Sequence, residues 1–187
     1  VIVYDELEAS EAVRWEWLLH SPTEFKIDAV KKTLSTDNKT KGWVAVTQLF
    51  GGHVFTLSQT DRFVVPPAIT GAEYPNQWHL TARVDGCSAT RFLAIIQIGD
   101  EAVSIINRDG DTFNVGDWTI KAVLDASKAP ELTVSHRTEQ AVFSYGTDNP
   151  ALNGNFYSRQ YTGSSLLYDE IDGAYQVVEM TDRSPIS

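Results

Sequence analysis

The sequence predicts an all-β protein, an antiparallel β-sandwich of two packed sheets. Short apolar runs recur at about 8–12-residue spacing between turn residues, which is typical of sandwiches. No segment carries the capped periodicity of a strong helix. One stretch alternates with a period of two: Val13, Trp15, Trp17 and Leu19 with Arg14, Glu16, Leu18 and His20.

The first element predicted is a β-hairpin over residues 1–21. Val1–Tyr4 is a β-branched and aromatic run, Asp5–Glu11 is polar, and the alternating run follows. We therefore expect a turn near Ala9 and a second strand whose tryptophans face a core. Each tryptophan buries on the order of 150–250 Å², so this face needs a second sheet over it.

Further strands and turns are predicted along the chain, in a single β-sandwich domain over residues 1–187. Residues 25–34 fit either a strand or a short helix, and residues 58–67 and 147–162 are expected to be loops. Turn residues stand at Asp85-Gly86, 108–111 and Gly116-Asp117. The expected strands cover residues 43–50, 53–57, 78–84, 91–98, 118–124, 131–135, 140–145, 165–168 and 175–180.

The charge of the chain disfavours nucleic acid as a partner. Fifteen Lys and Arg residues stand against 25 Asp and Glu residues, a net charge of −10, whereas such binding depends on phosphate neutralisation. The sequence contains no stretch of about 18 apolar residues, so no membrane-spanning helix is predicted. The single cysteine, Cys87, has no disulfide partner. Because the chain begins with a strand and lacks an initiator Met, we expect it to be a piece of a longer protein.

The four histidines, His20, His53, His79 and His136, are scattered and form no metal-binding motif. In the predicted hairpin, Asp5 and His20 lie about 25 Å apart at roughly 3.3 Å per residue, too far to share a zinc ion. We therefore expect no metal and no cofactor.

For the other candidate residues, a structural role explains the sequence better than a functional one. Tyr74 and His79 are close enough in sequence for an acid–base pair. Asp5-Glu6 and Asp169-Glu170 are carboxylate pairs, but adjacent strand residues point to opposite faces, whereas glycoside hydrolysis needs two carboxylates facing one sugar. Trp43, Trp78 and Trp118 would suit a sugar-stacking platform, although core tryptophans on alternating strands are more usual.

Several segments, in this order, resemble the C-terminal sandwich region of heparinase II/III-like polysaccharide lyases. They are VIVYDELEASEAVRWEWLLHS at 1–21, GGHVFTLSQTDRF at 51–63, QWHLTARV at 77–84, ATRFLAIIQI at 89–98 and SLLYDEIDG at 165–173. The WLLHS element is the most specific of them.

The resemblance implies a parent enzyme that cleaves uronate-containing polysaccharide by β-elimination, periplasmic or secreted and usually bacterial. Its catalytic residues and zinc ligands belong to an N-terminal α/α toroid and an early sheet segment, whose motifs do not occur here. The implied partners are that toroid and an acidic polysaccharide, and no catalytic or metal-binding residue is carried over. We expect this chain alone to be inactive. The alternative is a carbohydrate-binding module using exposed aromatic residues among Trp43, Tyr74, Trp78 and Tyr157.

Overall fold

The computed structural model describes residues 1–38, 43–62, 76–99, 104–138, 142–146, 151–152, 155–156, 165–171 and 174–180. In these ranges all regular structure is β-strand, with antiparallel sheets, which confirms the predicted all-β antiparallel sandwich class. The chain divides into two compact units, Val1–Val103 and Ser104–Ser187, each with one large sheet. The single domain over residues 1–187 stays a prediction.

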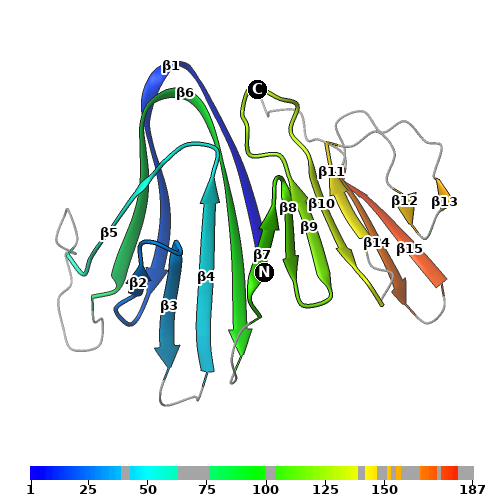
Figure 1. The fold of residues 1–187 in the computed structure, drawn as a ribbon, viewed down its shortest axis with the longest axis horizontal. Helices are drawn as coiled ribbons and strands as arrows, with labels where there is room; N and C mark the ends of the chain where they lie inside the picture. Colours follow the sequence, from blue (N-terminus) through cyan, green and yellow to red (C-terminus); the bar gives the residue numbers. More distant parts are fainter. Residues whose placement is uncertain are drawn as a thin grey trace. The chain divides into compact units, whose positions relative to one another are not determined.

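Unit 1 is built on a ribbon of two long strands, β1 (Ile2–Ser21) and β6 (Trp78–Gly99). Their antiparallel pairing runs from Ile2 opposite Ile95 to Ser21 opposite Trp78. Both strands turn back together at the top of Figure 1, so the ribbon folds over on itself. The remaining strands are β2 (Lys26–Asp28), β3 (Thr33–Asn38), β4 (Trp43–Gly51) and β5 (Thr56–Thr60).

The predicted hairpin over residues 1–21 is wrong, because β1 is one strand that pairs with β6 along its length. The register shifts between Glu8 and Val13 and again between Val13 and Trp15. On the partner strand, Gly86 has a φ of +73°, a conformation that glycine adopts without steric cost. Such irregularities bend a ribbon strongly. The small and polar residues that predicted a turn therefore mark a bend.

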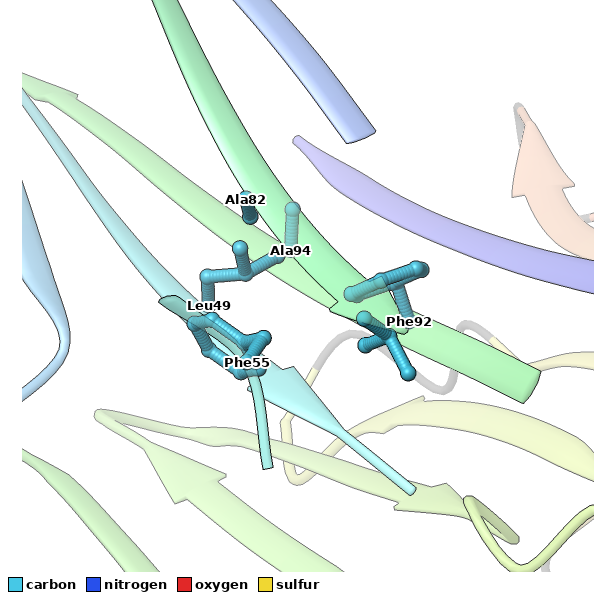
Figure 2. Close-up of a cluster of buried hydrophobic side chains, with 6 residues drawn as sticks. Leu49, Phe55, Ala82, Phe92 and Ala94 are labelled. Carbon is cyan, nitrogen blue, oxygen red and sulfur yellow. The ribbon is translucent and has the colours of Figure 1, made fainter. Parts of the chain in front are cut away.

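The two halves of the ribbon belong to two layers. β4 pairs with the second half of β6, from Phe92 to Gly99, and continues through β3 to β2. β5 pairs with the first half, from His79 to Arg83. The layers enclose a core of Leu49, Phe55, Ala82, Val84, Phe92 and Ala94, most of which Figure 2 shows gathered together.

β1 contributes to both sides of this core. Val3 and Leu7, from its first half, and Trp15 and Trp17, from its second half, pack against the same buried cluster. The alternation predicted for residues 13–20 is confirmed, since the odd-numbered side chains are half-buried and the even-numbered ones exposed. Folding the ribbon satisfies the need for a second layer over the tryptophans.

Other local predictions for unit 1 need correction. Asp85-Gly86 lies inside β6 and is not a turn between strands. Residues 25–34 are neither one strand nor a helix. A turn separates β2 from β3, in which the Asp28 carboxylate accepts hydrogen bonds from the amides of Val30 and Lys31. Residues 58–60, predicted as loop, belong to β5.

Unit 2 is a meander in which each strand pairs with the next one in the sheet. Its strands are β7 (Ile106–Asp109), β8 (Thr112–Val115), β9 (Trp118–Ala122), β10 (Leu132–His136), β11 (Val142–Tyr145), β14 (Ser165–Ile171) and β15 (Ala174–Met180). A separate ladder joins β12 (Ala151–Leu152) to β13 (Asn155–Phe156), within the predicted loop 147–162. The predicted turns at 108–111 and Gly116-Asp117 are confirmed, with Gly110 and Gly116 at φ of +58° and +60°.

The central strands of unit 2 have one apolar and one polar face. Phe113 lies opposite Ile120, and Ala122 opposite Leu132, and all four side chains are buried. On the other face, cross-strand neighbours are polar: Asn114, Thr119, Lys121, Thr133 and Ser135. This is the alternation expected of a sheet covered on one side.

Candidate functional site

The tryptophans of the most specific resembling segment are tied into the fold. The Trp15 indole Nε1–H donates to the Cys87 carbonyl oxygen at 3.0 Å, and the Trp17 Nε1–H donates to the Asp5 carboxylate at 2.9 Å. Asp5 and Trp17 lie in the same strand, and twelve extended residues would span roughly 40 Å. Their contact therefore fastens the two halves of the folded strand to each other.

The neighbouring polar residues of the ribbon are also used internally. Arg91 is 3% exposed, and its guanidinium lies 3.8 Å from the Glu6 carboxylate. Its backbone carbonyl accepts a hydrogen bond from the Gly52 amide. Next to it, the buried Thr90 hydroxyl lies 3.2 Å from His53 Nδ1. Of the predicted carboxylate pair, Asp5 and Glu6 thus each contact a different structural partner.

The four histidines occupy three separate places. His20 and His79 face each other across β1 and β6, with ring centroids 4.5 Å apart. His53 lies on the loop before β5 and contacts Thr90 of β6. His136 lies in unit 2. No group of three or more His, Cys, Asp or Glu side chains in the described part of the chain is placed to hold a metal ion. Because the predicted hairpin does not form, the distance of about 25 Å between Asp5 and His20 does not hold. In the structure Asp5 contacts Trp17, and His20 contacts His79.

An aromatic contact on unit 2 involves a partly exposed tryptophan. Trp118 is 38% exposed, and its ring meets the His136 ring edge to face at a centroid distance of 4.5 Å. Beside it, the Arg137 guanidinium donates twice to one Asp117 carboxylate oxygen, at 2.6 and 3.0 Å. An aromatic ring next to paired charged groups suits stacking and hydrogen bonding with a sugar.

The remaining predicted site residues lie apart from this cluster or outside the described residues. Trp78 is half-buried and packs against the cluster of Phe25, Leu34 and Leu80. Tyr74 and Tyr157, and the side chains of Trp43, Asp169 and Glu170, lie outside the described residues. The Trp118–His136 contact was not predicted from the sequence. The signal was present, since the two residues stand nine positions before and after Ser127, in the middle of a turn-rich segment.

Two exposed carboxyl groups have perturbed acidities. The Arg14 guanidinium, which donates to Asp85, lowers the pKa of that carboxyl, and the charge of Arg83 acts in the same direction. In unit 2, the Ser127 hydroxyl and amide lower the pKa of Asp125 by donating to it. Both groups are at the surface and belong to turns or bends, so these shifts reflect local structure.

Comparisons with known proteins do not identify a family. No protein-family model matches the chain, and no curated protein matches it significantly. Among the described residues, no helix is long and apolar enough to cross a lipid bilayer.

Proposed function

We propose that residues 1–187 are the non-catalytic C-terminal β-sandwich portion of a heparinase II/III-like polysaccharide lyase. The parent enzyme would cleave uronate-containing polysaccharide by β-elimination, in the bacterial periplasm or after secretion. Its α/α toroid and upstream sheet segment would supply the chemistry. This portion would pack against them and help wall the substrate cleft.

The contact between Asp5 and Trp17 is the observation that carries the proposal. The segments that resemble the lyases include both strands of the ribbon. Within them, the Asp5 carboxylate and the Trp17 indole hold the ribbon folded by bonding to each other. By accepting the indole N–H, the Asp5 carboxylate satisfies a partly buried hydrogen-bonding group within the fold. This use of the most characteristic residues favours a supporting role over a catalytic one.

The edge of the sheet supports the same proposal. β1 ends the strand order of unit 1, with β6 as its partner among the described strands. An edge strand presents backbone N–H and C=O groups to which a further strand can pair. In the proposed enzyme, upstream sheet strands of the parent would continue the layer from this edge.

Lyase assays test the proposal. Purified residues 1–187 are incubated with alginate, heparin-like and ulvan-type polymers, and the absorbance of the unsaturated product is followed. We expect no turnover from this chain and restored turnover when it is combined with the upstream part of the parent enzyme. Turnover by residues 1–187 alone would overturn the supporting role.

A second candidate function, an independent carbohydrate-binding module, is favoured by the Trp118–His136 cluster. The exposed indole and the neighbouring Asp117–Arg137 pair offer a stacking surface and hydrogen-bonding groups at one place. The ribbon tryptophans Trp15 and Trp17 do not contribute, because they pack in the core of unit 1.

Glycan arrays followed by calorimetry separate the two functions. Micromolar binding by the chain that is lost in Trp118→Ala and kept in Trp78→Phe would support the module. No saturable binding to neutral or uronate-containing glycans is the result expected from a supporting portion.

A further inference from the structure

Two histidines that neither proposed function uses lie side by side at one end of the ribbon. His20 of β1 is directly opposite His79 of β6, their ring centroids are 4.5 Å apart, and their planes are inclined by 54°. Directly opposite residues of an antiparallel pair have Cα atoms roughly 4.5–5.5 Å apart. The strand register therefore holds the two imidazoles together, independently of any loop.

The pair lies on the outer face of its layer, away from the core. Trp17 and Leu19 point inward, whereas His20 is exposed and His79 is half-buried between β1 and β5. Thr60 is the β5 residue opposite His79, and the next pair along this face is Leu18 with Thr81. Neither of these two rows contains a charged side chain.

The separation of the rings suits a shared transition-metal ion. Metal–imidazole bonds are about 2.0–2.1 Å long, so two rings on one ion have their bonded nitrogens about 3 Å apart and their centroids about 5 Å apart. Small rotations of the exposed His20 side chain bring 4.5 Å to that value. Each ring has two nitrogens, and one can bind the ion while the other keeps a hydrogen bond.

We propose that His20 and His79 form a site for a divalent transition metal, reached from the side of the exposed His20 because His79 Nε2 is buried, with Cu²⁺ bound most tightly and Ni²⁺ next. Within the described residues no third His, Cys, Asp or Glu side chain is placed to complete a ligand set. A closed structural zinc site needs four ligands, whereas nitrogen ligands favour Cu²⁺ over Ni²⁺ in the general affinity order. The site also differs from the Asp5–His20 pair considered from the sequence.

The bound ion would fasten the end of β1 to β6. Because the rigid pair exists in the folded ribbon and not in the unfolded chain, metal binding stabilises the fold by mass action. His53 and His136 provide matched controls, since each contacts a threonine or tryptophan in a different part of the structure.

The test is titration of the tag-free 187-residue chain with Cu²⁺, Ni²⁺ and Zn²⁺ by calorimetry, with electron paramagnetic resonance of the Cu²⁺ form. We expect one Cu²⁺ with two imidazole nitrogens, and a loss of affinity of roughly tenfold or more in His20→Ala and in His79→Gln. His53→Ala and His136→Ala should bind as the unchanged chain does. Because His20 is exposed, His20→Ala is expected to fold and keeps the test decisive. Equal Cu²⁺ affinity in His20→Ala, or a spectrum without two nitrogens, would overturn the site.

Discussion

Unit 1 and unit 2 are both antiparallel sheets, but their strands find partners in opposite ways. In unit 1, β1 pairs with β6, although four other strands lie between them in the sequence. In unit 2, strands pair with their neighbours along the sheet through short turns such as Gly110 and Gly116. Long-range pairing places Trp15, Trp17, Phe55 and Phe92 of unit 1 between two layers, while the unit 2 meander leaves Trp118 partly exposed. The described aromatic residues of the ribbon therefore stabilise the core, whereas Trp118 of the meander remains accessible to a ligand.

The largest expected effect comes from the core of the ribbon. Phe92 is fully buried and meets Phe55 edge to face, so Phe92→Ala should lower the free energy of unfolding by about 3–5 kcal/mol. Urea unfolding followed by tryptophan fluorescence measures it. Four of the five tryptophans belong to unit 1, and adding Trp118→Phe removes the one in unit 2. A shift below about 1 kcal/mol would contradict the folded-ribbon core.

Two glycines with nearly the same φ angle, one in each unit, allow the units to be compared. An alanine Cβ at Gly146 would lie 2.0 Å from the Pro130 carbonyl oxygen, whereas one at Gly86 meets nothing within 4 Å. Both have positive φ, at 72° and 73°. Gly86→Ala should cost about 1–2 kcal/mol from backbone conformation alone.

Gly146→Ala should therefore destabilise more than Gly86→Ala, by about 1 kcal/mol or more. Thermal unfolding followed by circular dichroism compares the two variants. Equal losses would show that the close approach to Pro130 does not constrain unit 2.

Breaking the hydrogen bond between Asp5 and Trp17, which ties the two halves of β1, should have a smaller effect than Phe92→Ala. Trp17→Phe keeps an aromatic ring in the core and removes the donor to Asp5, leaving a half-buried carboxylate without this bond. We expect a loss of about 1–3 kcal/mol in the free energy of unfolding. Trp17→Phe combined with Asp5→Ala should then cost less than the sum of the single variants. Additive losses would show that the bond does not couple the halves.

The smallest effects distinguish the two exposed carboxyl groups. A lowered pKa in the folded state stabilises the fold above the ordinary carboxyl range, and this contribution is lost as pH falls through the folded pKa, below 3.8. Asp85→Asn and Asp125→Asn should therefore lower Tm slightly at neutral pH and match the unchanged chain in strong acid.

The dependence on salt distinguishes the two carboxyl groups. The pKa of Asp85 is lowered mainly by Arg14 and Arg83, whereas that of Asp125 is lowered mainly by hydrogen bonds from Ser127. At about 1 M salt the effect of Asp85→Asn should shrink more than that of Asp125→Asn. Thermal unfolding across pH and salt measures both. An equal salt response would contradict the assigned causes.

The sequence predicts local features of this fold well and long-range ones poorly. The alternation in residues 13–20 correctly identifies the inner face, and the turns around Gly110 and Gly116 are correct because glycine chemistry is local. A bend shared by two strands produces the same small and polar signal as a hairpin turn, so residues 9–12 were misassigned.

The candidate sites show the same limit. The facing of Trp118 and His136 follows from one hairpin centred near Ser127, and counting residues from that turn finds it. The pairing of His20 with His79 depends on the strand order and on two register shifts within β1. Neither feature has a local signature, so this site could not be found without the structure.

The distance in sequence between the ribbon strands has a consequence during synthesis. β1 leaves the ribosome before β6, and residues that end opposite each other are separated by 57 positions at Ser21–Trp78 and 93 at Ile2–Ile95. At about 5–20 residues per second, the nascent strand waits roughly 3–20 seconds for its partner. During that interval two tryptophans and a run of valine and isoleucine remain open to other chains. Yield in a cell should therefore respond to chaperone supply and translation speed before it responds to the stability of the finished fold.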